Sequence, residues 1–211
     1  MDDLRAYLDR TAALAGQMPL AAIEAVIQRL IEAGERDQAI FVMGNGGSAA
    51  TASHFANDLS KGDVGGSARR LRVLALTDNV ALMTAWANDT AYQRVFAEQL
   101  RNFARPGDVV IGVSASGRSA NVLEAVRLGR AHGACTIGFT GQHGGDLKQL
   151  VDHCVQVPSD NVQHVEDLHL VAFHLVYSRL RDTFLTRPHD GRHSGGNGPA
   201  ALAPGPTNGP G

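Results

Sequence analysis

Apolar and polar residues alternate along this chain in blocks that predict strands and helices in turn. Short apolar runs between glycine or polar residues are typical of buried strands, which we expect at residues 40–43, 72–76, 108–113, 135–139 and 154–157. Apolar residues at helical spacing predict helices at residues 4–14, 20–32, 49–59, 80–86, 92–103, 120–131 and 160–185. This alternation, with short connections, predicts an α/β fold with a doubly wound, five-stranded parallel sheet flanked by helices.

The blocks also divide the chain into three parts. Residues 1–36 are predicted to form N-terminal helices, which either contact a partner subunit or cap the domain of their own chain. Residues 37–185 hold all the predicted strands and are expected to form a single domain. Residues 186–211 are rich in Gly, Pro, Asn and Ala without periodicity, which predicts a disordered tail. A glycine-rich loop is expected at residues 61–67.

Composition and charge exclude several classes of protein. With 211 residues, 44% of them apolar, and a formal net charge of −2, the chain has no general attraction to nucleic acid or acidic lipid. No apolar run approaches the roughly 20 residues of a membrane span, and the charged N-terminus does not resemble a signal peptide. We therefore expect no membrane partner and a cytoplasmic location. Cys135 and Cys154 are too few for a disulfide framework and are expected to be reduced core residues.

The stretch at residues 40–55 predicts a strand, a tight turn and a helix in direct succession. Gly44, Gly46 and Gly47 let the backbone of this turn adopt a positive φ and approach a ligand closely. The start of the following helix presents unpaired N–H groups and the positive end of its dipole, which favour an anion. Ser48 is expected either to cap that helix or to direct its hydroxyl to the ligand.

Two other interpretations of this turn stay open at the level of the residues. The glycines could serve only the close packing of a strand against a helix. Gly44, Gly46 and Ala49 also match the G-x-G-x-x-A pattern of dinucleotide-binding folds, in which an acidic residue follows about 20 positions later. Asp78 ends a predicted strand but comes later than that pattern requires.

A second turn, S-A-S-G-R-S at residues 114–119, repeats the plan of the first. Ser114, Ser116 and Ser119 follow a predicted strand and precede a helix, so hydroxyls and free amides together offer the donors that a phosphate needs. Arg118 either adds charge or points to solvent. Because both turns follow strands of a parallel sheet, we expect them to face one pocket. A serine turn without a ligand is the alternative, and a dinucleotide fold gives this turn no role.

The last predicted helix carries several candidate side chains. Asp160 followed by Gln163 resembles a capping box. Its apolar side is expected to consist of Val162, Val165, Leu168, Val171, Leu175 and Val176. From this pattern alone, His169 and His174 are predicted to be buried core histidines.

Two pairs of residues have spacings that bear on metal binding. His54 and Asp58 lie four positions apart on a predicted helix, so they share a face and can bind one ion. Glu166 and His174 lie eight apart, which separates their Cα atoms by about 12 Å on a helix. That is a long reach for one ion. Either the two side chains lean together, or they serve one site from different positions, for example across a subunit interface.

These segments together resemble a known family. In order, the motifs are G-N-G-G-S-A-A-x-A-x-H-F-A, A-N-D, S-x-S-G-x-S-A-N-V, T-G-x-x-G-G and E-x-x-H-x-x-x-x-H, within residues 37–180. They are similar to the sugar isomerase (SIS) domain and, within it, to the phosphoheptose isomerase group. The resemblance implies a single SIS domain and a homotetramer. The implied reaction interconverts sedoheptulose 7-phosphate and D-glycero-D-manno-heptose 7-phosphate.

The resemblance also implies which residues hold the sugar-phosphate substrate, with the serines on its phosphate. They are Asn45, Gly46, Gly47, Ser48, Asn88, Asp89, Ser114, Ala115, Ser116, Ser119 and Glu166.

By the same resemblance, one zinc ion per subunit is held by His54, Asp58, Glu166 and His174. Asp58 stands where the family usually has Glu, which is also its proposed base, and Glu166 stands where it usually has Gln. Asp is one methylene shorter, and an anionic ligand holds zinc more tightly while lowering its Lewis acidity. The implied mechanism is aldose–ketose exchange through a cis-enediol, with Asp58 as base and His174 as acid.

Two further hypotheses compete with this isomerase. A non-catalytic SIS module would act as a regulator or scaffold, like the bacterial relative that binds the replication initiator and has incomplete metal positions. The two histidines and two carboxylates present here favour catalysis instead. An isomerase of a different sugar phosphate is also considered, because the altered ligands could mark a changed substrate.

Overall fold

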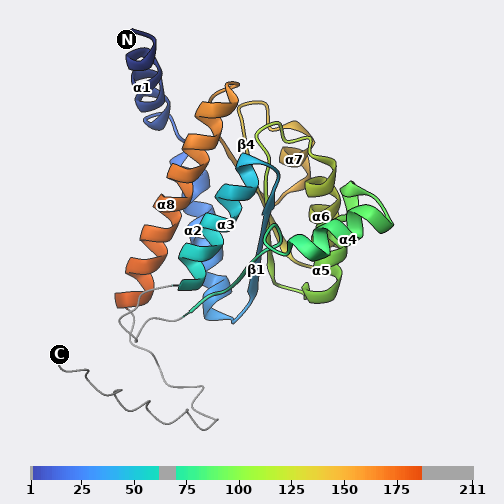
Figure 1. Cartoon of the computed structure of the whole chain (residues 1–211). Helices are drawn as coiled ribbons and strands as arrows, with labels where there is room; N and C mark the ends of the chain where they lie inside the picture. The colour runs from blue at the N-terminus through green and yellow to red at the C-terminus, as the bar shows by residue number, and fades with distance from the viewer. Residues whose placement is uncertain (1, 62–69, 187–211) are drawn as a thin grey trace, which may run out of the picture.

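The computed structural model describes residues 2–61 and 70–186 and confirms the predicted alternation of strands and helices (Figure 1). The strands are β1 (Ala39–Gly44), β2 (Arg72–Ala75), β3 (Val109–Val113), β4 (Cys135–Thr140) and β5 (His153–Gln156). The helices before β3 are α1 (Asp2–Ala15), α2 (Leu20–Glu35), α3 (Gly47–Lys61), α4 (Val80–Asp89), the 3₁₀ helix η1 (Tyr92–Arg94) and α5 (Ala97–Phe103). The helices after β3 are α6 (Ala120–Ala131), α7 (Gly145–Leu150) and α8 (Val162–Thr186).

The five strands form one parallel sheet in the order β2-β1-β3-β4-β5, as predicted. The chain runs outward in one direction from β1 to β2 and in the other from β3 to β5. In open parallel sheets of this order, a crevice forms at the carboxyl ends of β1 and β3, where the direction changes. The two turns that the sequence singles out follow β1 and β3, so the fold brings them to the same edge of the sheet, at the point where the strand order changes direction.

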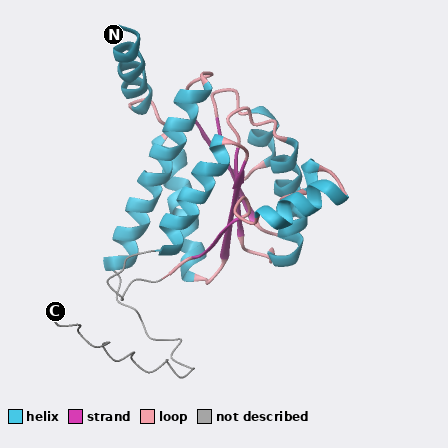
Figure 2. Ribbon diagram, in the orientation of Figure 1, coloured by secondary structure: helices cyan, strands magenta, loops and turns pink. Residues whose placement is uncertain are grey.

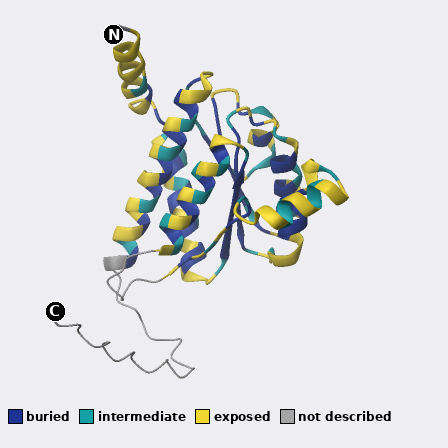
Figure 3. Cartoon of the chain, viewed as in Figure 1, coloured by how far each residue is buried: buried dark blue, intermediate teal, exposed yellow. Residues whose placement is uncertain are grey.

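Helices cover both faces of the sheet (Figure 2). Alternate residues of β1 belong to two separate core clusters. Ile40 and Val42 belong to a cluster that includes side chains of α2, α3 and α8. Phe41 and Met43 belong to a second cluster, with side chains of α5, α6 and α7. Figure 3 shows the strands as a buried layer between the helices. Double burial explains the apolar runs of the central strands β1, β3 and β4, whereas the edge strands β2 and β5 are only partly buried.

The structure differs from the predicted helices at two places before α8. The predicted helix at residues 92–103 is divided into η1 and α5, and residues 95–100 between and within them are all buried. An amphipathic helix buries one face, not six successive positions, so a continuous surface helix does not suit this segment. The six-residue helix α7 was not predicted, because so short a segment shows no periodicity.

Helix α8 also differs from its prediction, first at its start. Its cap is Asn161 rather than Asp160, since the Asn161 side-chain oxygen accepts a hydrogen bond from the His164 N–H at 3.2 Å. Among the predicted apolar side chains, Val162, Val171 and Leu175 are 50%, 40% and 44% exposed. The buried side consists of His164, Val165, Leu168, His169, Ala172, Phe173, Val176, Leu180 and Phe184. Apolar residues of α8 therefore lie outside its buried face as well as on it.

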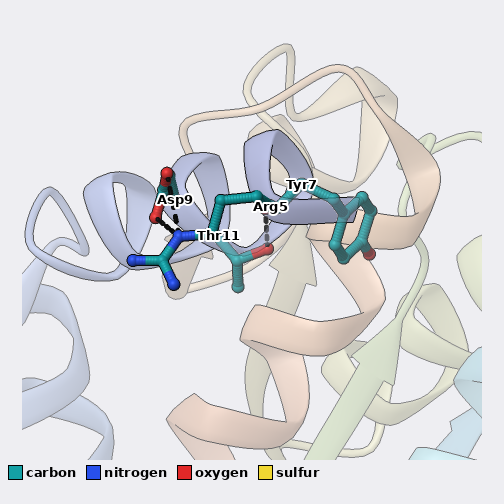
Figure 4. A network of polar contacts seen from close by, with 4 residues as sticks. All are labelled: Arg5, Tyr7, Asp9 and Thr11. Atoms are coloured by element: carbon teal, nitrogen blue, oxygen red, sulfur yellow. Dashed lines mark hydrogen bonds and ion pairs between the residues drawn. The ribbon is translucent and has the colours of Figure 1, made fainter. Parts of the chain in front are cut away.

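The N-terminal helices behave differently from each other. Helix α2 contributes Val26 and Leu30 to the first core cluster, so it is part of the folded body. Helix α1 projects away from that body (Figure 1), and residues 3–10 are exposed. Its polar contacts are partly internal: Arg5 pairs with Asp9 at 3.1 Å, and the Thr11 hydroxyl donates to the Tyr7 carbonyl at 3.0 Å (Figure 4).

The remaining sequence predictions concern the cysteines, the flexible segments and membranes. Cys135 and Cys154 are free thiols but are half-buried rather than core residues, and partial burial raises the pKa of both. The predicted loop and tail lie outside the described residues, apart from Lys61, which ends α3, and Thr186, which ends α8. Of the helices that the structure describes, none is both long enough and apolar enough to cross a membrane.

Candidate functional site

The turn after β1 is built around three glycines with three different roles. A Cβ on Gly44 would lie 2.7 Å from the backbone of Ser48, so this position must be glycine for the turn to close. Gly46 has a positive φ of 55° and open space around it. A Cβ on Gly47 would lie within 2.6 Å of the Glu166 carboxylate. Helix α3 begins at Gly47, earlier than predicted, and Ser48 is only 5% exposed in its first turn.

Glu166 reaches this turn from α8. Its carboxylate lies against Gly47, at the N-terminus of α3, where the helix dipole favours a negative charge. The predicted substrate-binding turn therefore has an acidic side chain beside its exposed backbone.

The serine turn gathers its hydroxyls in one place. Ser114 Oγ lies 3.0 Å from Ser119 Oγ and 3.5 Å from Ser116 Oγ. Ser119 is the N-cap residue of α6, yet its side chain makes no capping hydrogen bond. The hydroxyls thus gather at the start of this 12-residue helix, and the Ser119 hydroxyl is not hydrogen-bonded to its first N–H groups. That combination offers several donors and a positive dipole end to the oxygens of a phosphate.

A third turn, at residues 141–145, packs closely against the serine turn. Gly117 has a positive φ of 64°, and a Cβ there would lie 2.0 Å from the Gly144 carbonyl oxygen. A Cβ on Gly145 would lie 2.5 Å from the Ser116 carbonyl oxygen. The Gly141 N–H donates to the Ala115 carbonyl at 2.9 Å. Reasoning from the residues did not find this contact, although the glycines of T-G-x-x-G-G were a signal for it.

The two predicted ligand turns are joined directly. The amide of Asn45, after β1, exchanges two hydrogen bonds of 2.8 Å with the amide of Asn121, in the first turn of α6. Asn121 was not predicted as a site residue. Its place in the motif S-x-S-G-x-S-A-N-V was the available signal.

The A-N-D residues lie at the end of α4. Asn88 and Asp89 are both exposed, and the Asn88 amide donates to the Asp89 carboxylate at 2.8 Å. Two residues separate them from η1, whose Tyr92 hydroxyl donates to Asn45 at 3.0 Å. Asp78, the acid considered for a dinucleotide site, instead accepts a hydrogen bond from the Ser53 hydroxyl of α3.

Three of the four predicted metal ligands come together between α3 and α8. Nε2 of His54 lies 3.4 Å from Nε2 of His174 and 3.4 Å from Oδ2 of Asp58. Nε2 of His174 lies 3.9 Å from the same Asp58 oxygen. The two histidine side chains are 45% and 50% exposed, and Asp58 is 20% exposed, so the group opens to solvent.

This group fits a zinc ion. Tetrahedral zinc with bonds of about 2.0–2.1 Å separates its ligand atoms by about 3.3–3.4 Å. The two distances from His54 match this value at 3.4 Å, and the His174–Asp58 distance is longer, at 3.9 Å. Two imidazoles and one carboxylate also form the donor set of catalytic zinc sites, which keep a position open for water or substrate. Among the described residues, this group of three is the one whose donor atoms can hold a metal, and Glu166 is not part of it.

The geometry explains why Glu166 lies apart. Glu166 meets Gly47 at the start of α3, and His174, eight residues later, meets His54 and Asp58 further along α3. Helices α3 and α8 therefore run side by side in the same direction. Between them, the rings of Phe55 and Phe173 are stacked with their centroids 4.1 Å apart. The separation of about 12 Å expected from the spacing is maintained.

The two histidines of α8 have opposite environments. His169 is 1% exposed, as predicted, and its Nε2 lies 3.2 Å from the Thr140 carbonyl. Burial lowers its pKa to about 4, so this ring is neutral at physiological pH. His174 was expected in the core from the pattern alone, but it is half-exposed beside Asp58.

Comparison with known proteins identifies the class. A family model of the SIS domain matches residues 5–141, which is more than half of the chain. The chain therefore belongs to the SIS-domain family, as its sequence motifs predicted.

Its relatives define the group within this family. The chain is 39% identical to phosphoheptose isomerase from Roseiflexus sp. (strain RS-1), over 83% of this chain and 88% of that protein. It is 35% identical to the probable phosphoheptose isomerase of Thermoplasma acidophilum, over 86% of this chain and all of that one. The structure of phosphoheptose isomerase GmhA from Neisseria gonorrhoeae superposes with a TM-score of 0.80 and 28% identity, covering 86% and 98% of the two chains. The protein is thus an isomerase of the phosphoheptose isomerase group.

Proposed function

We propose that the protein interconverts sedoheptulose 7-phosphate and D-glycero-D-manno-heptose 7-phosphate in the cytoplasm, with one zinc ion per subunit. The observation that carries this proposal is the group of His54, Asp58 and His174, in the same chain as the two turns predicted to bind an anion. A non-catalytic module needs no such donor group. The named relatives support the choice of a heptose phosphate as substrate.

We assign the phosphate of the substrate to the serine turn. The hydroxyls of Ser114, Ser116 and Ser119 and the start of α6 converge there, and none of them is spent on capping the helix. The backbone and side chains of residues 45–48, together with Asn88 and Asp89, would then contact the sugar. Anchoring the phosphate away from the reacting carbons fixes which carbon meets the base.

Asp58 is assigned as the base and His174 as the acid. Asp58 removes a proton from the carbon beside the carbonyl, and His174 returns a proton to the neighbouring carbon. As the cis-enediol forms and collapses, the carbonyl oxygen gains a proton and the neighbouring hydroxyl loses one, and Asp58 and His174 regain their starting protonation by exchange with solvent. Both side chains are partly open to solvent and close enough to share one substrate, at 3.9 Å. When bound by His54, Asp58 and His174, zinc would polarise the carbonyl and hydroxyl oxygens of the sugar.

Glu166 is assigned to substrate rather than to the metal. Its carboxylate lies beside Gly47, at the turn that would hold the sugar. An ionised carboxylate accepts hydrogen bonds only, so it suits the hydroxyls of a heptose.

A homotetramer is part of the proposal, and exposed apolar side chains support it. Leu4 and Leu8 on α1 are 73% and 63% exposed, and Val171 and Leu175 on α8 are also exposed. Helix α1 contacts its own chain through Tyr7, whose hydroxyl donates to Asp167 of α8 at 2.6 Å. An isolated helix of this length is unstable in water. We therefore assign the apolar side of α1 to a contact with a second copy of the chain.

The test is turnover of sedoheptulose 7-phosphate by the purified protein, followed by NMR, with the zinc content measured on the same sample. We expect turnover to fall on chelation and to return with zinc. Asp58→Asn should lower kcat by at least about 100-fold, because general base catalysis contributes that much or more. Binding of the sugar phosphate should persist.

The matched control is Asp160→Asn, which makes the same change at an exposed position before α8. It should keep full turnover. Absence of turnover in protein that holds both zinc and the sugar phosphate would contradict the proposal, and full activity of Asp58→Asn would remove Asp58 as the base.

A further inference from the structure

Three side chains from separate segments form a hydrogen-bond network beside the first turn. The amides of Asn45 and Asn121 exchange two hydrogen bonds of 2.8 Å, one in each direction. The Tyr92 hydroxyl donates to Oδ1 of Asn45 at 3.0 Å. Oδ1 of Asn121 also accepts from the backbone N–H of Val122 at 3.0 Å. Asn121 is 2% exposed, so its amide depends on these partners rather than on water.

The Val122 N–H determines the orientation of the side-chain amides of Asn121 and Asn45. A backbone N–H can only donate, so the Asn121 atom beside it must be the carbonyl oxygen. The other end of this amide is then its NH2 group, and the Asn45 atom facing that group must be an acceptor. Turning the Asn45 amide over would set two NH2 groups and two carbonyl oxygens against each other. The backbone of α6 thus dictates the orientation of Asn45.

One N–H of the Asn45 side-chain amide has no partner in the network. Its oxygen accepts from Asn121 and Tyr92, which occupies both lone pairs. Its nitrogen donates one of two hydrogens to Asn121, so one N–H has no partner in the network. Asn45 is half-buried, and the residues that follow it, Gly46 and Gly47, are exposed.

We propose that Asn121 and Tyr92 are positioning residues that hold Asn45 as a hydrogen-bond donor toward the substrate. The inference rests on the proposed function in taking a sugar phosphate as ligand. Asn45 then binds an oxygen that has a lone pair, such as a carbonyl, hydroxyl or phosphate oxygen. It disfavours a group that can only donate, such as the ammonium of an amino sugar. The site gains specificity from two residues that need not touch the substrate.

Two substitutions test this assignment, with binding and steady-state kinetics measured on sedoheptulose 7-phosphate. Asn121→Asp keeps the acceptor for Val122 but sets a second oxygen against Oδ1 of Asn45, which disrupts its orientation. We expect KM and Kd to rise by about 30-fold or more, as for a lost hydrogen bond with an unpaired buried acceptor. Tyr92→Phe removes one bond only and should raise KM by about 3- to 10-fold. Asn102→Asp, the same change at an exposed position of α5, should alter neither.

NMR of the side-chain amides separates positioning from a general structural effect. In the unaltered protein, a side-chain N–H signal of Asn45 should shift when sedoheptulose 7-phosphate is added. Asn121→Asp should abolish that shift, while inorganic phosphate still shifts the backbone amides of Ser116 and Ser119. An Asn45 signal that ignores the sugar phosphate in the unaltered protein overturns the inference.

The remaining outcomes are also decisive. If Asn121→Asp does not fold, Tyr92→Phe carries the test, because Tyr92 is 56% exposed and its loss should leave the fold intact. An unchanged KM and Kd in Tyr92→Phe would then refute the proposal. A shifted Asn45 signal without any turnover would support the positioning role and reject the isomerase assignment, so the two can fail separately.

Discussion

His169 and His174 lie five residues apart on α8, and their surroundings give the same side chain two different tasks. His174 opens to solvent beside Asp58 and His54, where a ring nitrogen can bind a metal or move a proton. His169 is enclosed, donates toward the Thr140 carbonyl through Nε2, and has no partner for Nδ1 among the described residues. Exposure and an acidic neighbour make His174 the candidate for chemistry, whereas burial suits His169 to a structural role.

The buried ring of His169 makes the stability of the protein depend on pH. Its pKa is about 4 in the folded chain and 6.5 in the unfolded chain, so the unfolded state binds the extra proton between these values. The stabilisation is complete above about pH 6.5 and is lost as the pH falls toward 4. From pH 7.5 to pH 5, this group should lower the free energy of unfolding by about 2 kcal/mol.

The measurement is urea unfolding at both pH values for the unaltered protein and His169→Gln, which keeps a side-chain N–H for Thr140 but does not titrate. The variant should lose about 2 kcal/mol less than the unaltered protein between these pH values. His143→Gln, at an exposed position, should show the unaltered dependence. Equal pH dependence in all three proteins would contradict the role of His169.

At the scale of elements, Gly46 and Gly117 allow a matched comparison, because both have a positive φ but only one is crowded. Gly46→Ala should cost about 1–2 kcal/mol of stability from backbone strain alone. Gly117→Ala adds a clash with the Gly144 carbonyl and should cost about 3 kcal/mol or more. Only Gly117→Ala should also weaken binding of inorganic phosphate, because it separates the serine turn from its support.

Chemical denaturation and phosphate titration would check both variants. Equal destabilisation by the two substitutions, or unaltered phosphate affinity in Gly117→Ala, would mean that the contact between the two turns is unimportant.

How far the sequence predicts each element depends on whether its determinants are local. Buried parallel strands are continuous apolar runs, and glycine and serine turns follow from local backbone and hydroxyl requirements, so both were predictable. Helix α7 is too short to show a period. The bond between Asn45 and Asn121 requires β1 and β3 to be neighbours, which no local pattern encodes. His174 shares the spacing of the buried side of α8 closely enough to be mistaken for a core residue, and the family resemblance alone linked it to His54.

For the whole molecule, the exposed apolar side of α1 is the main feature that one chain does not satisfy. The Tyr7 hydroxyl donates a hydrogen bond to Asp167 of α8, and its ring stacks on that of His164 with the centroids 4.2 Å apart. Leu4 and Leu8 remain exposed. Leu14 anchors the end of α1 in the core of its own chain, so the exposed first turns of the helix remain available to a second copy. The proposed tetramer should therefore depend on Leu4 and Leu8.

The double substitution Leu4→Ser with Leu8→Ser should reduce the mass in light scattering below that of four chains, because it removes apolar area from the proposed contact. Circular dichroism should change little. Val80→Ser, at an apolar position of α4 that is 66% exposed, is the control and should leave the mass unchanged. A doubly substituted protein that still has the mass of four chains would exclude α1 from the contact.

The parallel arrangement of α3 and α8 also sets an order of events during synthesis. His54 and His174 are 120 positions apart, so at typical rates of translation His174 is made about 6 to 24 s after His54. A nascent chain can fold β1, α3 and β3, but it presents only two of the three donor atoms. The complete group forms when α8, the last helix described, docks beside α3. Metal loading in the cell should therefore follow the synthesis and docking of α8, and a ribosome-bound chain that ends before α8 should not retain zinc.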